Sequence, residues 1–194
     1  MDDDTYTILG CITKYKADDI RPYVESIEQT GFKGRKVMLV YDVPQETIDY
    51  LKSKGWDLFG GELQQHIILQ RFRDLYKLLG SEIKGTVIWT DVKDVIFQKD
   101  PTDWIEHNME DDILSFSECI TFKNDPWACV NAGTSFPMEW EWLQNKTSYC
   151  AGTIVGDACY LRDLFIDIYR WSLTTANQEQ LSDQAAYNVL INLH

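Results

Sequence analysis

Two aspartates, Asp91 and Asp94, follow a short apolar, β-branched run at residues 87–90 that predicts a buried strand. Ligands of open α/β sheets bind at the carboxyl ends of the strands, where these two side chains would lie. Carboxylate oxygens are hard ligands suited to Mg²⁺ or Mn²⁺, and either ion can neutralise a diphosphate. The pattern therefore indicates a metal site, although an ordinary acidic loop after a strand would show the same residues.

Two arginines, Arg71 and Arg73, lie on the helix predicted just before this strand. Arg71 falls between Ile68 and Leu75, near the face that the spacing predicts to be buried. A guanidinium in that position can bind a phosphate or a carboxylate in bidentate fashion. Contact with an anionic ligand and a structural ion pair both remain open for Arg71, whereas Arg73 is expected to be a solvated helix charge.

Strands and helices alternate through the first half of the chain, which predicts an α/β fold with a mostly parallel central sheet flanked by helices. Strands are predicted at residues 6–13, 36–41, 56–59, 87–90, 113–117 and 151–156, and helices at about 19–30, 44–54, 63–79, 158–173 and 182–193. Residues 121–149, rich in Trp, Asn and Pro, are expected to be irregular apart from a short helix near Trp140.

The size and charge of the chain limit its partners. Its 194 residues predict one domain, 1–194, which could be a module of a longer protein. A net charge of -13 disfavours nucleic acid and anionic membrane surfaces as partners. A nucleotide could still bind if a divalent cation and a few local basic residues offset its charge.

The cysteines and the apolar runs indicate where the protein resides. The five cysteines are scattered and odd in number, which favours reduced thiols over a disulfide framework. No apolar run is long enough for a transmembrane segment, and the acidic start does not resemble a signal peptide. We therefore expect a cytoplasmic location.

Common nucleotide-binding and hydrolase signatures are missing. The sequence has neither the phosphate-binding loop Gly-x-x-x-x-Gly-Lys-Ser/Thr nor Gly-x-Gly-x-x-Gly after the first strand, and it lacks Gly-x-Ser-x-Gly. A nucleotide would therefore have to be bound by polar groups at strand ends together with a metal ion.

Three segments resemble GT-A-fold glycosyltransferases, in the same order along nearly the whole chain. Residues 90–101, Thr-Asp-Val-Lys-Asp-Val-Ile-Phe-Gln-Lys-Asp-Pro, look like the metal-binding segment, with Asp-x-Asp spread to Asp-x-x-Asp. Residues 150–156, Cys-Ala-Gly-Thr-Ile-Val-Gly, resemble the strand that lines the sugar pocket, and residues 131–134 are a competing match. Residues 183–188, Asp-Gln-Ala-Ala-Tyr-Asn, resemble the Asp-Gln-x-x-x-Asn helix start of glycogenin-like enzymes. The resemblance implies the GT-A, or nucleotide-diphospho-sugar transferase, fold.

The resemblance also implies a set of metal ligands. Asp94 would be the main ligand of Mn²⁺ or Mg²⁺, and Asp91 would bind the metal or the donor ribose. Some family members use a late histidine as a further ligand, and His194 is the candidate here. The extra residue between the two aspartates leaves the division of roles between them open.

Donor-binding residues are implied at the ends of other strands. Thr13, Lys14 and Tyr15 would face the nucleoside, with Tyr15 stacked on the base, and Asp42 would accept a hydrogen bond from uracil. Each of these residues could instead belong to a solvated loop. Arg71 would contact the donor. In the sugar-pocket strand, the implied donor-binding residues are Gly152 and Thr153, and a glycine there lets the backbone approach the sugar closely.

Candidate catalytic residues come from two further positions. Asp183 and Gln184 would border the reacting sugar carbon, although an aspartate at a helix start is also a good capping residue. Glu118, a carboxylate predicted at the end of a strand, is a candidate base. The tryptophans near Trp140 could form a sugar platform, but core packing is the favoured explanation for them.

The resulting hypothesis is a metal-dependent hexosyl- or pentosyltransferase that moves a sugar from a UDP-linked donor to a hydroxyl of a glycan or glycoconjugate. The lack of a clear base and the Asp-Gln pair favour retention of the anomeric configuration. A sugar-1-phosphate nucleotidyltransferase is the alternative enzyme, although it would usually carry a Gly-rich basic loop after the first strand. A catalytically inactive carbohydrate-binding domain is the alternative outside enzymes.

Overall fold

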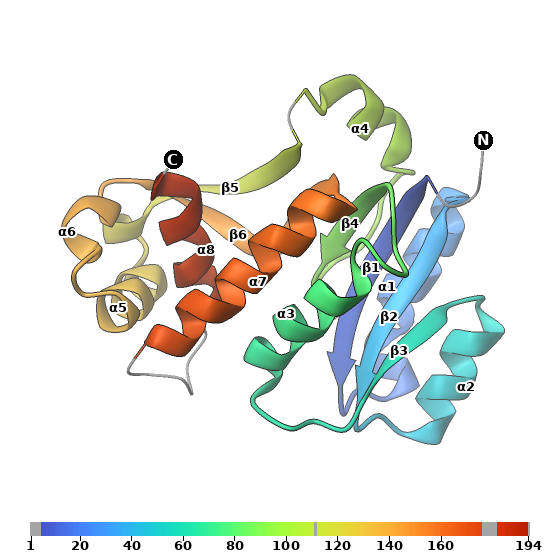
Figure 1. Cartoon of the computed structure of the whole chain (residues 1–194). Helices are drawn as coiled ribbons and strands as arrows, with labels where there is room; N and C mark the ends of the chain where they lie inside the picture. Colours follow the sequence, from blue (N-terminus) through green and yellow to red (C-terminus); the bar gives the residue numbers. More distant parts are fainter. Residues whose placement is uncertain (1–4, 111, 176–181, 194) are drawn as a thin grey trace.

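The computed structural model describes residues 5–110, 112–175 and 182–193, which form a six-stranded sheet with helices on both faces (Figure 1). The strand order is β3-β2-β1-β4-β6-β5. The strands are β1 (Tyr6–Thr13), β2 (Arg35–Tyr41), β3 (Asp57–Gly61), β4 (Thr86–Thr90), β5 (Ile113–Thr121) and β6 (Thr147–Asp157).

The sheet is mostly parallel, as predicted, with one strand reversed. β3, β2, β1 and β4 pair in parallel, and β6 pairs antiparallel with both β4 and β5. β5 therefore runs in the same direction as β4, and β6 is inserted between them. The reversed strand is longer than predicted, and its register places Thr153 opposite Thr90.

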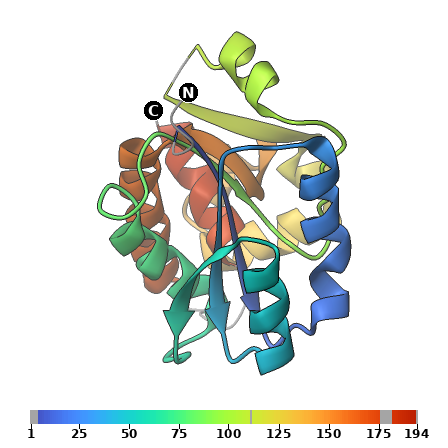
Figure 2. The same cartoon turned by 90° about the vertical axis from the view of Figure 1, so that its right-hand side faces the viewer.

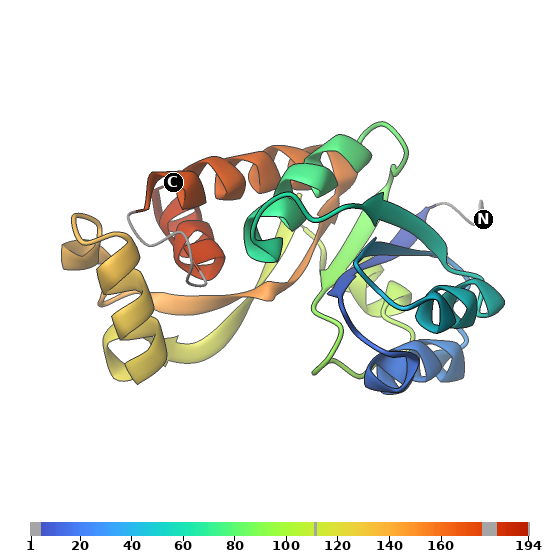
Figure 3. The same cartoon turned by 90° about the horizontal axis from the view of Figure 1, so that it is seen from below.

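Two apolar cores fill the space between the sheet and the helices, one on each face. On one face, β-strand residues such as Leu9 and Trp89 pack in the core that also contains Phe72 of α3 (Ile67–Leu78) and Phe165 of α7 (Ala158–Thr174). On the other face, the core joins the sheet to α1 (Ala17–Thr30) and α2 (Gln45–Ser53). Figures 2 and 3 show α3 and α7 on the side of the sheet opposite α1 and α2.

The helices predicted near residues 19–30, 44–54, 158–173 and 182–193 are confirmed, the last being α8 (Ser182–Leu193). α3 begins at Ile67, four residues later than the predicted start. The short helix α4 (Thr102–Asn108) was not predicted.

The prediction of an irregular region at residues 121–149 is wrong. This stretch contains the 3-10 turn η1 (Phe122–Asn124), α5 (Pro126–Ser135), the expected short helix α6 (Trp140–Leu143) and the start of β6. Asp125 is the N-cap of α5, and its carboxylate accepts hydrogen bonds from the backbone nitrogens of Trp127 and Ala128. Trp140 and Trp142 pack against the core, as favoured, whereas Trp127 is 46% exposed.

Two expectations from the sequence concern the cysteines and membrane-spanning segments. All five cysteines have free thiols. In the described part of the chain, no helix combines the length and the apolar character needed to cross a membrane.

Candidate active site

Asp91 follows the carboxyl end of β4 and lies on the face of the sheet covered by α3. Successive strand residues point to opposite faces, so Trp89 lies in the α3-side core while Thr90 bonds Tyr23 of α1, with 2.8 Å between the two hydroxyl oxygens. Asp91 continues the alternation, and its backbone nitrogen donates to the Gly152 carbonyl of β6 at 2.7 Å. The end of β4 is thus fixed against the reversed strand.

Gly152 makes room for the Asp91 carboxylate. A Cβ atom placed on Gly152 would overlap the Oδ2 and Cγ atoms of Asp91, so no larger residue fits without moving that side chain. The predicted reason for a glycine here was close approach of the backbone to a sugar. The structure gives it a different neighbour, the side chain of Asp91.

Arg71 joins two carboxylates that are far apart in the sequence. Its Nη1 donates to Asp91 Oδ1 at 3.0 Å, and its Nη2 donates to Asp183 Oδ2. The Arg71 side chain is 15% exposed and that of Asp183 only 5%. Burial opposes the charged guanidinium, but Asp183 and Asp91 outweigh it and raise the pKa of Arg71. Arg71 is therefore a fixed cation between two fixed anions.

A cavity of about 490 Å³ opens beside Arg71 and Asp91. Five of the residues predicted to bind metal or donor line it together: Thr13, Tyr15, Arg71, Asp91 and Asp94. Because β1 and β4 are parallel neighbours, their carboxyl ends meet at one edge of the sheet. We call this space the first cavity. Its volume lies in the range of small-ligand sites.

Four lining residues were not singled out from the sequence: Cys11, Ile67, Val92 and Lys93. Lys93 lies between the two aspartates, and its Nζ is 5.6 Å from the centroid of the Tyr15 ring. The only sequence signal for Lys93 was its place inside the Asp-x-x-Asp segment. Cys11 follows from β1 alternation, since it lies two residues before Thr13 on the same face.

Lys14 and Asp42 do not line the first cavity. Both are exposed, and both have positive φ angles, 58° and 51°, at the points where the chain leaves β1 and β2. The Lys14 nitrogen donates to the Tyr41 carbonyl at 3.2 Å, which ties these two strand ends together. In this structure the two residues shape the turns that follow the strands.

Two predicted site residues lie elsewhere. Thr153 points to the opposite face from Gly152 and lines an apolar pocket with Thr90 and Val155, because neighbouring residues of a strand alternate. Glu118 does not end a strand: β5 continues to Thr121, and Glu118 is an exposed residue within it. Neither residue lines the first cavity.

Asp183 and Gln184 lie in the first turn of α8. Asp183 Oδ1 accepts a hydrogen bond from the Gln184 nitrogen at 2.9 Å, while its other oxygen binds Arg71. Asn188, one turn later, accepts from the Tyr149 nitrogen and donates to the Tyr149 carbonyl, both at 2.8 Å. The helix is therefore fixed to β6 at a point close to Gly152, which sets the position of Asp183.

The first cavity offers two carboxylates to a cation. No group of three or more His, Cys, Asp or Glu side chains suited to a metal occurs among the described residues, and His194 lies outside them. Asp91 and Asp94 fit the mode in which Mg²⁺ or Mn²⁺ is bound by one or two carboxylates and completed by water and phosphate oxygens. Asp94 is exposed and has no ion pair within the described part of the chain.

Comparison with known proteins extends these observations at the level of the fold. No family model matches the sequence, and no curated protein matches it. Among solved structures, the chain is similar to the glycosyltransferase GlyE of Streptococcus pneumoniae TIGR4, with a TM-score of 0.61 and 16% sequence identity. The similarity covers 95% of this chain but only 42% of the GlyE chain. The chain therefore shares the α/β fold of one part of a glycosyltransferase.

Proposed function

We propose that the protein is a metal-dependent GT-A glycosyltransferase that moves a sugar from a UDP-linked donor to a hydroxyl of a glycan. The proposal rests chiefly on one observation: Asp91, Asp94 and Arg71 line a single cavity at the carboxyl ends of β1 and β4. That is the edge at which α/β sheets bind ligands. The similarity of the fold to a glycosyltransferase supports the same class of reaction.

The nucleoside would enter beside β1. Tyr15 and Thr13 line that side of the cavity, and Lys93 lies close enough to the Tyr15 ring for a cation–π contact. Thr13 Oγ1 is buried and has no hydrogen-bond partner among the described residues, so a ligand hydroxyl or carbonyl there would satisfy it. Tyr15 would stack on the base.

The diphosphate would lie between Lys93 and Arg71. Asp94 and Asp91 would hold Mn²⁺ or Mg²⁺, which supplies charge neutralisation of the leaving diphosphate when bound. Arg71 keeps Asp91 in position through its 3.0 Å contact. Gly152 leaves the Asp91 carboxylate the space it needs.

We also propose that the reaction retains the anomeric configuration. Inversion needs a base that deprotonates the acceptor hydroxyl, and Glu118, the candidate base, is exposed on β5 and does not line the first cavity. Asp183 is fixed by Arg71 and by its own helix, which suits a residue that stabilises positive charge on the sugar. The NMR spectrum of the first product formed would establish the anomer.

Calorimetry with UDP tests the proposal. UDP should bind wild-type protein more tightly with Mn²⁺ than without it, and Asp94→Ala should lose this metal-dependent gain. Asp103→Ala, which removes an exposed carboxylate from α4, is the matched control and should keep it. Equal UDP affinity with and without Mn²⁺ in the wild type, or an unchanged gain in Asp94→Ala, would contradict the proposal.

Two assays separate the alternatives. A sugar-1-phosphate nucleotidyltransferase would release pyrophosphate from a nucleoside triphosphate. The segment after β1, Thr13-Lys14-Tyr15, lacks the Gly-rich loop that such enzymes usually have. A binding domain without activity would hydrolyse no UDP-sugar, even with Mn²⁺ and excess acceptor.

A further inference from the structure

A second cavity, of about 390 Å³, lies on the other side of α3, over β2 and β3. Its apolar wall is formed by Leu39, Phe59 and Leu78, and the remaining lining is polar. The polar lining residues are Tyr41, Gly60, Gly61, Glu62, Gln64, Gln70, Arg73, Asp74 and Lys77. None of the expected donor or metal residues is among them, so the proposed reaction leaves this space unused.

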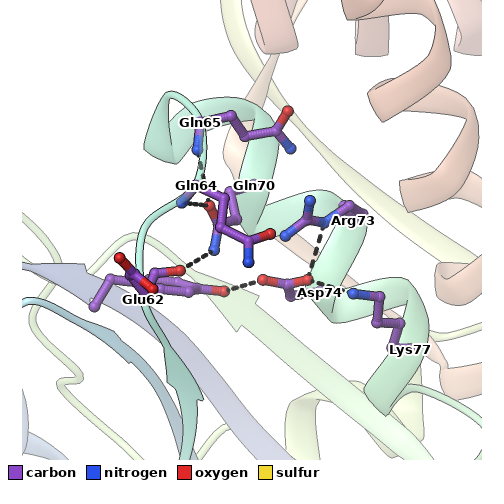
Figure 4. A network of polar contacts seen from close by, with 8 residues as sticks. Glu62, Gln64, Gln65, Gln70, Arg73, Asp74 and Lys77 are labelled. Atoms are coloured by element: carbon purple, nitrogen blue, oxygen red, sulfur yellow. Dashed lines mark hydrogen bonds and ion pairs between the residues drawn. The ribbon is translucent and has the colours of Figure 1, made fainter.

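Asp74 organises the charged side of the second cavity (Figure 4). Arg73 Nε and Lys77 Nζ both donate to Asp74 Oδ1, at 3.1 and 3.0 Å, and the Tyr41 hydroxyl donates to Asp74 Oδ2 at 2.8 Å. One carboxylate therefore receives three donors. Arg73, which was expected to be a solvated helix charge, has a side chain only 25% exposed.

Gln70 fixes the opposite wall. Its side-chain oxygen accepts from the backbone nitrogens of Gln64 and Gln65, at 2.7 and 3.2 Å, and its amide nitrogen donates to the Glu62 carbonyl at 3.0 Å. Gln70 is 2% exposed, and these bonds attach the loop after β3 to α3. The cavity is therefore a shaped site with walls held from within the fold.

Arg73 and Lys77 keep unused donors in the second cavity, which the Glu62 carboxylate also lines. Arg73 has five N–H groups and Lys77 three, and each uses one group on Asp74. Asp74 is already contacted by three donors, so little of its capacity to accept remains. A ligand with several acceptor oxygens, and above all an anion, would complement these groups.

The apolar wall restricts the ligand further. A cavity of this size suits a small molecule of one or two rings. Phe59 and Leu78, which are partly exposed, can cover an apolar ring face while the charged side binds oxygens at the ring edge. A saccharide that carries a carboxylate or a phosphate combines both properties, whereas a free inorganic anion would leave the apolar wall in contact with water.

The two cavities are neighbours but present different groups. Ile67 and Arg71 of α3 line the first cavity, and Arg73 and Lys77 line the second. Asp183 and Gly152, which bond Arg71 and Asp91, lie beyond β4 on the side away from β2 and β3. The second cavity is therefore separate from the place where a sugar would be transferred.

We propose that the second cavity is a binding subsite for an anionic saccharide unit, held by Arg73 and Lys77 against the wall formed by Phe59 and Leu78. Occupancy requires neither the nucleotide nor the metal. The subsite would retain an acidic glycan close to the first cavity without contacting the reacting atoms.

Ligand-observed NMR titration of the whole protein, without nucleotide or metal, tests this subsite. The probes are methyl glucuronide, glucose 6-phosphate and neutral methyl glucoside. At least one anionic probe should bind with a dissociation constant of about 1 mM or below, and about tenfold more tightly than the neutral one. The two anionic probes show whether the site prefers a carboxylate or a phosphate.

Variants that remove either a positive or a negative charge from the second cavity test the subsite further. Arg73→Gln and Lys77→Gln should each weaken binding of the preferred anionic probe by about tenfold. Glu62→Gln should strengthen it by about twofold, because Glu62 places a negative charge at the same cavity. Arg170→Gln is the matched control, since Arg170 is an exposed cation paired with an aspartate three residues earlier, as Lys77 is. It should change nothing.

Three results would overturn the subsite. The first is neutral glucoside binding as tightly as both anionic probes. The second is anionic binding that Arg73→Gln and Lys77→Gln leave unchanged. The third is displacement of the saccharide by one equivalent of UDP and Mn²⁺, which would make the second cavity part of the donor site. None of these results bears on whether Asp94 is needed for UDP binding, so the two proposals fail independently.

Discussion

The first and second cavities are each lined by two carboxylates and two cations, but these groups are paired differently. At the first cavity one guanidinium, Arg71, donates hydrogen bonds to two carboxylates, and Asp94 has no ion pair in the described part of the chain. In the second, one carboxylate, Asp74, accepts hydrogen bonds from two cations and a hydroxyl. The unpaired Asp94 carboxylate is therefore available to a cation in the first cavity, and the unused N–H groups of Arg73 and Lys77 are available to an anion in the second, although α3 contributes to both.

Helical geometry accounts for this difference. Arg71 and Arg73 are two residues apart, and residues at that spacing point to different sides of a helix. Arg71 points to the end of β4 and to α8, and it is 15% exposed. Arg73 points over β2 and is 25% exposed. A shift of two positions thus separates an arginine paired with two carboxylates from one paired with a single carboxylate.

The largest expected effect is a difference in protein stability between variants of these two arginines. Arg71→Met should lower the free energy of unfolding by about 3–5 kcal/mol, because Asp183, with a side chain 5% exposed, would be left charged and unpaired. Arg73→Met should cost less than about 1 kcal/mol, since Lys77 and Tyr41 still contact Asp74. Urea unfolding of both variants measures the difference.

A double variant checks the cause. Arg71→Met combined with Asp183→Asn should recover part of the lost stability, because the buried charge is then removed together with its partner. If the double variant is as unstable as the sum of the two single variants, the ion pair is not the source of the effect.

A second prediction concerns space in the first cavity alone. Gly152→Ala should weaken UDP binding in Mn²⁺ by roughly 10- to 100-fold, because the new methyl group displaces the Asp91 carboxylate. Binding of an anionic saccharide at the second cavity should not change. Gly133→Ala is the matched control: the nearest atom to the added methyl group belongs to Trp140 at 3.7 Å, an ordinary contact. Equal effects of the two substitutions would contradict the assignment of Gly152 to the site.

A third prediction uses acid to probe the second cavity. Burial opposes the Asp74 carboxylate, but hydrogen bonds from Arg73, Lys77 and Tyr41 outweigh it and lower the pKa of Asp74 below its ordinary value of 3.8. Its contribution to stability is therefore fully present above that value and is lost as the pH falls through the lowered pKa.

Urea unfolding at several pH values measures this contribution. Asp74→Asn should be less stable than the wild type near pH 6, by about 1 kcal/mol or less, and the difference should shrink towards about pH 3. A difference that stays constant over this range would show that the charge of Asp74 is not what holds Arg73 and Lys77.

The smallest expected effect is at Cys11, which lines the first cavity. Burial raises the pKa of Cys11 to about 12, with Arg71 opposing the shift and Asp91 and Asp74 adding to it. At about pH 8 the thiol is thus almost fully protonated and unreactive. The exposed Cys119 and Cys159 should be alkylated by iodoacetamide first, as peptide mass spectrometry would show. Rapid labelling of Cys11 would contradict the raised pKa of its thiol.

The parts of the fold that sequence predicted well have strong local signals. Continuous apolar runs marked β1, β2 and β4, and the aspartates after β4 were placed correctly at the strand end. α5 had a signal that the prediction overlooked, Asp125 followed by Pro126. Its buried face consists of small residues and an asparagine, so it lacks the large apolar side chains that reveal a helix by periodicity.

The candidate site was predicted only in part, for a geometric reason. Thr153 and Glu118 were chosen from motif position and from an assumed strand end. Adjacent residues of a strand point to opposite faces, so Thr153 lies on the face away from Gly152. β5 extends four residues beyond the predicted strand 113–117, so Glu118 lies within it. The second cavity had no sequence signal, because its charged residues lie on α3 and in the loop after β3, and its apolar wall comes from β2, β3 and α3.

The sequence by itself determined which residues could act: two carboxylates after a buried strand, an arginine near a buried helix face and a helix starting with Asp-Gln. Local pattern carries this information because strand and helix periods follow from backbone geometry. Only the tertiary structure decided that Arg71 meets Asp183, 112 positions later, and that β6 enters between β4 and β5 to set Gly152 against Asp91. Contacts of that range depend on how whole elements pack, which no short stretch of sequence specifies.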